Sequence, residues 1–148
     1  MANRVFNIAK GFEAYYASLP ASTDSLVAVL LKLSGLEADG TLEDYDTLSA
    51  LLAASNDEAT DASYSRQTLT SVTYSPPDDT NDKVNIDCAD IVFTSLAGAA
   101  IGKLLICYVP SSGAADSAIV PVSMHDASFT PDGTTQTFTV SNFISITD

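Results

Sequence analysis

The sequence predicts a mainly β fold: an antiparallel β-sandwich or barrel with one or two short helices and an N-terminal arm. The most informative segment is residues 104–109, a continuous apolar run that Pro110 ends. A run that short is typical of a strand buried on both faces of a sheet. From residue 64 onward, short segments of alternating polarity are separated by turn-forming residues, as in antiparallel folds. We therefore expect the strand at 104–109 to lie at the centre.

Length, composition and charge narrow the class of protein. The chain has 148 residues and a hydrophobic fraction of 46%, enough for one domain, residues 1–148, with a buried core. Its 19 acidic and 6 basic residues give a formal net charge of −13. Because phosphate binding needs clustered lysine and arginine, neither nucleic acid nor an anionic membrane is expected as a partner. The first ten residues lack the apolar core of a signal peptide, so a soluble protein made in a reducing cytoplasm is expected.

The N-terminal third contains three candidate elements before the main helix. Residues 1–12 alternate loosely in polarity and form either a first strand or an arm. Residues 13–19 predict a short helix that Pro20 prevents from continuing. Residues 26–33 form a strand or a buried helix, and apolar residues of one parity favour the strand.

Residues 41–54 predict the main helix. Thr41, followed three residues later by Asp44, resembles a capping box. Apolar residues recur at three- and four-residue spacing, which places them on one helical face: Leu42, Tyr45, Leu48 and Leu52. We expect this helix to cover one open end or edge of a sheet.

Short alternating segments supply the remaining strands, at residues 68–74, 84–88, 91–93, 118–124, 135–140 and 143–146. The apolar parity switches between the second and third of these, which predicts a β-bulge near Ala89 and Asp90. Pro121 has no N–H to donate to a neighbouring strand, so the strand that contains it is expected at a sheet edge.

The chain has two cysteines, Cys88 and Cys107, both inside predicted strands. Two buried, reduced thiols are favoured. A disulfide between them stays open, because it requires that the two strands be neighbours. No cysteine or histidine spacing matches a metal site, and we expect no cofactor.

The run Ser123-Met-His125-Asp126 contains the residue types of a hydrolase triad. Neighbouring residues of a strand point to opposite faces, so closeness in sequence does not make a triad. His125 is the only histidine, and a structural role is favoured for it. We therefore expect no enzymatic activity.

Residues 78–82, Asp-Asp-Thr-Asn-Asp, are the densest cluster of oxygen ligands. Calcium is bound by several carboxylate and carbonyl oxygens that converge from one loop. The central glycine and the final glutamate of an EF-hand loop are missing, so a solvated loop is favoured and a loose calcium site is the alternative.

The segment from Gly98 to Gly102 lacks the lysine and the helix of a phosphate-binding loop and is interpreted as a turn.

Aromatic residues offer a further alternative, a sugar-binding surface. The candidates are Tyr15, Tyr16, Tyr45 and Tyr64. The chain has no tryptophan, the strongest stacking platform, so packing in the core or in an interface is favoured for most of them.

Charge is distributed unevenly along the chain. Residues 1–12 carry two basic residues and no acidic residue, in contrast to the acidic remainder. An apolar, mildly basic arm on an acidic body suggests docking on a partner, and the alternative is an arm folded onto its own body. The predicted partner-binding residues are Arg4, Val5, Phe6, Ile8 and Lys10.

Five stretches carry a resemblance to a known family: residues 1–11 (MANRVFNIAKG), 51–60 (LLAASNDEAT), 66–69 (RQTL), 78–82 (DDTND) and 102–108 (GKLLICY). In these stretches, which extend nearly from end to end, the chain resembles small virion structural proteins of tailed bacteriophages. The family often has a tryptophan and an aspartate where this chain has Phe93 and Val109, so these two local environments differ.

The resemblance implies a capsid decoration or cement protein on the exterior of the virion, made in the host cytoplasm. Such proteins are β-rich, often homotrimeric, and lie where capsomers meet. The implied partners are the major capsid protein and further copies of this chain. Two alternatives stay open: a receptor- or glycan-binding module on the particle surface, and a structural component of the head–tail junction or tail. No catalytic residue carries over from the family.

Overall fold

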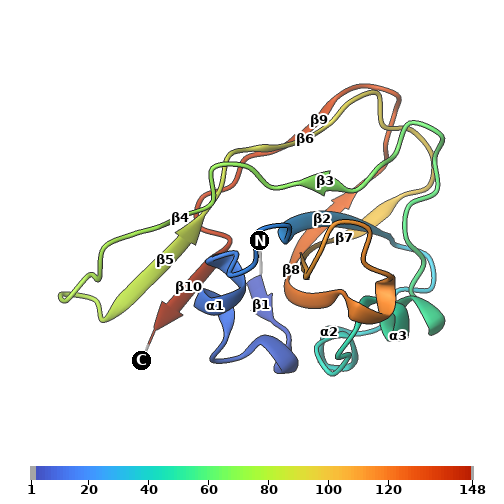
Figure 1. The fold of residues 1–148 in the computed structure, drawn as a ribbon. Coiled ribbons are helices and arrows are strands. Elements are labelled where there is room, and N and C mark those ends of the chain that lie inside the picture. Colours follow the sequence, from blue (N-terminus) through green and yellow to red (C-terminus); the bar gives the residue numbers. More distant parts are fainter. Residues whose placement is uncertain (1–2, 148) are drawn as a thin grey trace.

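The computed structural model describes residues 3–147, which form short antiparallel strands around one larger sheet (Figure 1). The larger sheet has five strands in the order β1-β8-β7-β2-β3. Their bounds are Asn3–Val5 for β1, Val120–Phe129 for β8, Ile101–Val109 for β7, Ser25–Lys32 for β2 and Gln67–Thr68 for β3. The predicted mainly β fold with a few short helices is confirmed.

Strand β7 occupies the centre of this sheet, as the apolar run at 104–109 predicts. It pairs antiparallel with β2 on one side and with β8 on the other. All of its residues except Val109 are buried, because both faces of the sheet are covered. At Gly102 the chain is closely packed, since a Cβ there would lie 2.7 Å from a methyl carbon of Leu36 and 3.1 Å from the Cα of Leu33, and these neighbours would have to shift.

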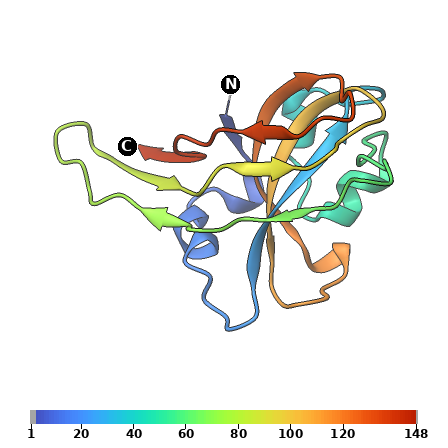
Figure 2. The same cartoon turned by 90° about the horizontal axis from the view of Figure 1, so that it is seen from above.

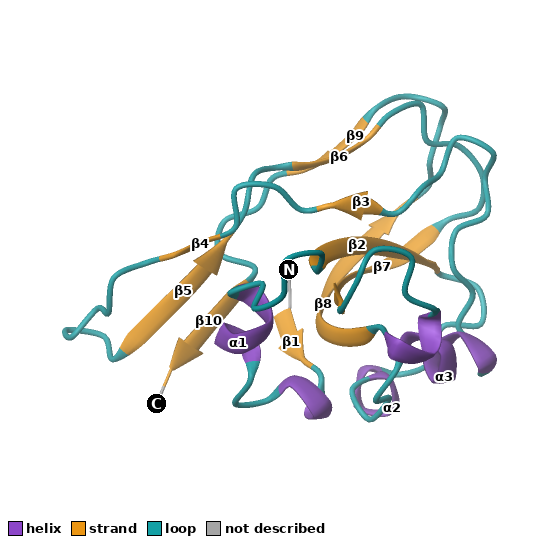
Figure 3. Ribbon diagram, viewed as in Figure 1, coloured by secondary structure: helices purple, strands orange, loops and turns teal. Residues whose placement is uncertain are grey.

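One face of the central sheet is covered by two short helices, α2 (Asp39–Leu42) and α3 (Leu48–Ala53), below the sheet in Figure 3. The apolar side chains between these helices and the sheet form one buried cluster: Phe6, Val27, Val29, Leu31, Leu42, Leu48, Leu51, Leu105, Cys107, Ile119 and Met124. The helices therefore cover a face of the sheet, and the expectation that a helix covers an open end or edge is wrong.

The opposite face is covered by two smaller antiparallel sheets, one of order β10-β5-β4 and one that pairs β6 with β9. The bounds are Thr73–Tyr74 for β4, Lys83–Asp87 for β5, Ile91–Phe93 for β6, Gln136–Phe138 for β9 and Ile144–Thr147 for β10. Their side chains join the alternate residues of β2 and β7 in a second buried cluster, which includes Leu30, Ile86, Phe93 and Ile106. The hairpin of β4 and β5 extends beyond the central sheet (Figure 2).

The helical elements of the described chain are all short. Besides α2 and α3 they are η1 (Asn7–Ala9), α1 (Glu13–Ala17) and η2 (Asp116–Ala118). The short helix predicted before Pro20 is confirmed as α1. Within residues 3–147, none of these helices has the length and apolar character needed to cross a membrane.

The single helix predicted at residues 41–54 is wrong, because the chain forms two helices there. The predicted cap, Thr41, lies inside α2. The capping residue is instead Thr47, whose Oγ1 accepts a hydrogen bond from the backbone N–H of Ala50 at 3.2 Å.

Contacts with distant segments interrupt this helix. The carbonyl of Glu43 accepts a hydrogen bond from the backbone N–H of Asn7 at 2.8 Å. The N–H of Leu48 donates to the carbonyl of Ile119 at 2.9 Å. A continuous helix would use both groups internally, so the tertiary bonds replace one helical turn.

Two strand predictions are corrected by the sheet pairing. The bulge predicted near Ala89 and Asp90 is instead a crossing between sheets, since β5 pairs with β4 and β10 whereas β6 pairs with β9. The strand predicted at 68–74 divides into β3 and β4. Ser71 interrupts it, with a φ of 54°, outside the extended region.

The edge position predicted for the strand of Pro121 is wrong, because β8 lies between β1 and β7. Strand β1 pairs only with residues 123–125 of β8. On the other side, the β7–β8 ladder shifts register between Ile106 and Cys107, opposite Pro121. The missing N–H therefore lies beyond the pairing with β1 and beside an irregularity, where an interior strand tolerates it.

Both cysteines are buried and free, so the prediction of two reduced thiols is confirmed and the disulfide is excluded in this structure. Burial, together with the charge of Asp87, raises the pKa of Cys88 to about 12. Burial also raises the pKa of Cys107 well above its usual value. Both thiols therefore stay protonated and act as small apolar side chains.

Candidate partner-binding face

The N-terminal segment that the sequence predicts as an arm is folded onto the body of the protein. Strand β1 extends the central sheet by pairing with residues 123–125 of β8. The next residue continues this pairing, since the N–H of Phe6 donates to the carbonyl of Val122 at 3.0 Å. Val5 is half-buried and Phe6 fully buried. Two of the predicted partner-binding residues thus contact the protein's own core.

Arg4 points to the helical side and pairs with acidic residues there. Its guanidinium lies 3.2 Å from the carboxylate of Asp39 and 3.7 Å from that of Glu43. The Arg4 side chain is 47% exposed. Ion pairs this exposed contribute about 0–1 kcal/mol, so Arg4 can exchange them for a partner's carboxylates at little cost.

The other two predicted residues, Ile8 and Lys10, are exposed. Lys10 reaches back to its own turn, where Nζ donates to the side-chain oxygen of Asn7. The segment after β1 therefore presents an apolar and a basic side chain to solvent.

Helix α1 extends this exposed surface with aromatic rings. Phe12 is 58% exposed, Tyr15 is 55% exposed and Tyr74 of β4 is 41% exposed. The Tyr74 hydroxyl donates to the carbonyl of Ala14 at 2.6 Å, which joins β4 to α1. We define the α1 shoulder as the exposed side chains larger than alanine in residues 8–15, together with Tyr74, which is bonded to α1: Ile8, Lys10, Phe12, Tyr15 and Tyr74.

The α1 shoulder concentrates the exposed apolar side chains of the described residues. Residues 3–147 have six large apolar side chains that are exposed, and four of them belong to the α1 shoulder. The other two are Leu33, directly after β2, and Val92 on β6. Single exposed apolar residues are ordinary, whereas a group of them marks an interaction site. Aromatic residues are also enriched in protein interfaces.

Sequence reasoning found part of this surface and missed the rest. It favoured packing for Tyr15 and Tyr16, but only Tyr16 is half-buried, where its ring lies 5.0 Å from that of Tyr108. Ile8, Phe12 and Tyr15 lie within residues 8–15, a closeness in sequence that could have indicated a shared surface, although Gly11, with a φ of 80°, separates η1 from α1. Tyr74 carried no such signal, because its contact with α1 joins segments distant in sequence.

Ser123 and His125 contact each other, a pairing that the sequence reasoning did not predict. Two residues apart on β8, they share one face, and His125 Nε2 lies 3.0 Å from Ser123 Oγ. Asp126 faces the other side of the sheet, where it pairs with Lys103. The charge of Asp126 raises the pKa of His125, against the larger effect of burial.

Burial lowers the pKa of His125 to about 4. An efficient general base has a pKa near the operating pH, and an imidazole so weakly basic takes a serine proton poorly. These properties favour the structural role that the sequence predicts for His125.

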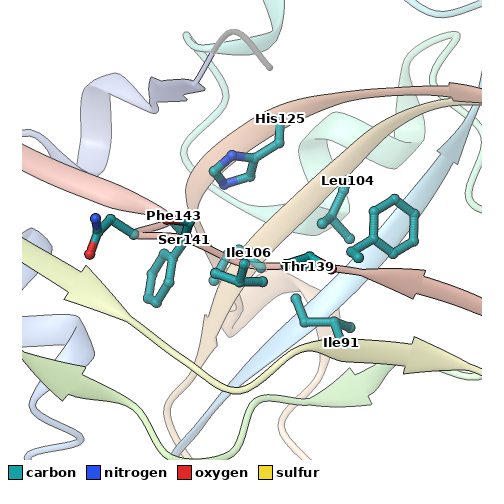
Figure 4. A pocket seen from close by; sticks show the side chains of 10 residues that line it. Ile91, Leu104, Ile106, His125, Thr139, Ser141 and Phe143 are labelled. Carbon is teal, nitrogen blue, oxygen red and sulfur yellow. The ribbon is translucent and has the colours of Figure 1, made fainter.

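A cavity of about 260 Å³ lies beside this pair, between the central sheet and the segment that joins β9 to β10 (Figure 4). Its walls are mostly apolar and include Ile91, Leu104, Ile106 and Phe143, with His125 and Ser141 among the polar lining residues. Apolar cavities of about 150 Å³ bind benzene, so this one has room for an aromatic ring.

The acidic loop at residues 78–82 uses its first carboxylate internally. Asp78 accepts hydrogen bonds from the backbone N–H groups of Thr80 and Asn81 and from the Asn81 side chain. Across residues 3–147, no three histidine, cysteine or acidic side chains are placed to hold a metal ion. These contacts favour the solvated loop over the calcium site.

No family model matches this chain, and no curated protein or solved structure matches it either. The fold and the α1 shoulder rest on the chain's own residues.

Proposed function

We propose that this protein is a virion structural protein of a tailed bacteriophage, a capsid decoration or cement protein that stabilises the head lattice. It acts by burying the α1 shoulder against a neighbouring subunit of the particle, without catalytic turnover. The observation that carries the docking role is that four of the six large exposed apolar side chains of residues 3–147 belong to residues 8–15 or to Tyr74, which is bonded to α1. The sequence resemblance supports a phage head as the particle to which the protein binds.

The chemistry of the α1 shoulder suits specific docking. Full burial of a large apolar side chain contributes about 1.5–3 kcal/mol. Two basic residues, Lys10 of the shoulder and Arg4 of β1, stand out on a chain with a formal net charge of −13. That net charge keeps the free protein soluble and opposes unspecific association.

The shoulder is also held in place before it binds. The Tyr74 hydroxyl fixes β4 to α1 through the carbonyl of Ala14. Tyr16, on the other side of the helix, packs against Tyr108 of the central strand. A surface ordered in advance loses little conformational entropy on binding.

In this mechanism each copy binds weakly and many copies act together. Ligands that bind only the assembled state stabilise it by mass action. Contacts with more than one subunit raise the avidity well above the affinity of a single contact.

The test uses phage heads that lack this protein, to which the purified protein is added. We expect wild-type protein to sediment with the heads and to raise the temperature at which they release DNA. The double variant Ile8→Ser, Tyr15→Ser should bind at least 10-fold more weakly. The control Leu33→Ser, which removes an exposed apolar side chain outside the shoulder, should bind like wild type. Heads that bind no wild-type protein, or release DNA at an unchanged temperature, contradict the proposal.

A glycan-binding module is the second candidate, favoured by three exposed rings on one surface: Phe12, Tyr15 and Tyr74. Exposed rings stack on sugars as well as on proteins. This candidate predicts that the same double variant lowers adsorption of particles to host cells and leaves head stability unchanged.

A further inference from the structure

A short segment outside the strands covers the cavity beside His125. The pairing of β9 with β6 ends at Phe138, and the pairing of β10 with β5 begins at Ile144. Residues 139–142, between these two strands, all line the cavity. We infer that residues 139–142 form a lid, which opens over the cavity while the rest of the protein stays folded. This inference concerns a movement within one chain and does not depend on the proposed function.

The floor of the cavity is nearly closed to solvent while the lid is in place. Ile106 is 0% exposed, Leu104 3% and His125 4%. Figure 4 shows the segment of Thr139 and Ser141 passing close to these side chains. A reagent in solution therefore reaches the floor only after the lid, or the whole fold, has opened.

The lid makes few contacts with the core. Thr139 and Ser141 are exposed, and Val140 and Asn142 are half-buried. Next to the lid lies a cavity of about 260 Å³, so its inner surface lacks contacts that a filled core provides. Segments with few buried contacts open at a lower free energy than the core of a protein does.

Two carboxylates hold the backbone of the lid in place of a neighbouring strand. Asp90 accepts a hydrogen bond from the N–H of Val140, and Asp87 accepts one from the N–H of Asn142, each at 3.1 Å. Asp90 is exposed and Asp87 is half-buried, so water reaches both acceptors when the lid lifts. Because water replaces the lost bonds, opening costs less free energy than breaking bonds in a buried sheet.

The two ends of the lid are fixed, which confines the movement to these four residues. The ring of Phe138 lies 5.8 Å from that of Phe93 and 5.7 Å from that of Phe129. At the other end Phe143 is buried. Asn142, beside it, has a φ of 60°, in the left-handed region. Hinges are residues at the ends of elements that absorb a change in backbone angles, and Asn142 is placed to act as one.

The first test measures how fast a thiol on the cavity floor reacts with a soluble thiol reagent. Ile106→Cys places this thiol under the lid, in a chain that also carries Cys88→Ala. The neighbouring Cys107 is the built-in control, since it is fully buried in the cluster between the sheet and the helices. We expect position 106 to react at least about 10-fold faster than Cys107, because opening of the lid exposes only the cavity side.

The carboxylate of Asp90 provides a matched pair of variants. Asp90→Ala removes one bond to the lid and should speed the reaction at position 106 about 5- to 10-fold, without a change at Cys107. Asp90→Asn keeps a side-chain oxygen as acceptor, so both thiols should react as they do in the parent chain.

The second test needs no new cysteine, so it also decides the question if Ile106→Cys does not fold. It follows amide hydrogen exchange by NMR in wild type and in Asp90→Ala. Asn142 keeps its own bond to Asp87 in this variant. If the lid opens as a unit, the Asn142 amide should exchange about 5- to 10-fold faster in Asp90→Ala, and that of Leu105 in β7 should exchange as before.

Three results overturn the inference. Equal reaction rates at position 106 and Cys107 would mean that the floor is reached only by global unfolding. Equal acceleration of both thiols by Asp90→Ala would mean that Asp90 stabilises the whole fold and not a lid. An Asn142 amide whose exchange is the same in wild type and Asp90→Ala would mean that the two bonds break independently.

Discussion

The ammonium group of Lys103 lies 2.6 Å from the carboxylate of Asp39 and ties the helical layer to the centre of the sheet. Lys103 is buried on β7 and also pairs with Asp126 of β8. Asp39 opens α2 and pairs in turn with Arg4 of β1. One buried cation and its partners therefore join four elements that are far apart in sequence.

Replacing Lys103 with methionine keeps an unbranched apolar stem and removes the charge. Asp39 and Asp126 are partly exposed, so each regains water when the cation is lost. We expect the free energy of unfolding to fall by about 1–3 kcal/mol, less than for a fully buried pair. Urea titration measures this loss. The control Lys32→Met should change stability by less than about 0.5 kcal/mol, and equal losses in both variants would contradict the assigned role.

The same ion pairs have a pH signature. Burial lowers the pKa of Lys103, but hydrogen bonds to Asp126 and Asp39 outweigh it and leave the pKa above its ordinary value. A raised pKa contributes stability that is complete below the unfolded pKa of about 10.4 and is lost as pH rises through the folded pKa. The stability difference between wild type and Lys103→Met should therefore persist at pH 9 and shrink only as the pH rises past the ordinary lysine pKa of about 10.4.

Arg66 bridges two carboxylates at the edge of the central sheet. Its guanidinium nitrogens lie 2.6 Å from Glu58 and 2.6 Å from Asp116. A lysine cannot reproduce this two-sided fork, so Arg66→Lys should cost about 1–2 kcal/mol of unfolding free energy. Arg4→Lys, at an exposed pair, should cost less than about 0.5 kcal/mol in the same urea titration. A smaller loss at Arg66 than at Arg4 would contradict the prediction.

His125 should make the protein less stable in mild acid. Its folded pKa of about 4 lies below the ordinary histidine pKa of about 6.5, so the unfolded chain binds the proton first as pH falls. Stability should decrease by about 2–4 kcal/mol between pH 6.5 and pH 4 through this group. His125→Gln keeps a hydrogen-bonding partner for Ser123 and removes the titration.

The measured quantity is the difference in unfolding free energy between wild type and His125→Gln at pH 7 and at pH 4. Carboxylates titrate in both chains and cancel in this difference. Equal pH dependence of the two chains would mean that His125 does not stay neutral in the folded protein.

Calcium should leave the protein unchanged. Asp78 already accepts hydrogen bonds from within its own loop, and these would have to break for it to bind a cation. We expect 1 mM calcium or excess chelator to shift the melting temperature by less than about 1 °C, since a ligand that does not bind contributes no stabilisation. A clear rise with calcium that Asp78→Asn abolishes would instead support the calcium site.

The central strand could be predicted from the sequence because its burial leaves a continuous apolar run at residues 104–109. The first residues of this strand could not be predicted. Gly102 lies close to Leu36, and the buried Lys103 pairs with Asp39, and both neighbours are distant in sequence. The break in the helix was hidden for a similar reason, because it depends on backbone bonds to distant segments. Patterns in a sequence report burial well and report pairing between distant residues poorly.

The candidate site could also be predicted only in part from the sequence. Composition identified the N-terminal segment and its basic residues, Arg4 and Lys10. Which side chains point outward depended on β1 adding to the sheet, which buries Phe6 and leaves Phe12 exposed. The cavity could not be predicted, since its walls come from four separate stretches of the chain.

We propose a structural role for this protein in a phage head, and its copy number in the particle tests that role most directly. Quantitative mass spectrometry of purified particles gives the ratio of this chain to the major capsid protein. We predict nearly stoichiometric copies, as expected for decoration of the whole lattice. A handful to a few dozen copies would contradict lattice-wide decoration and favour a head–tail or receptor-binding role. Absence from the particles would contradict any structural role in the virion.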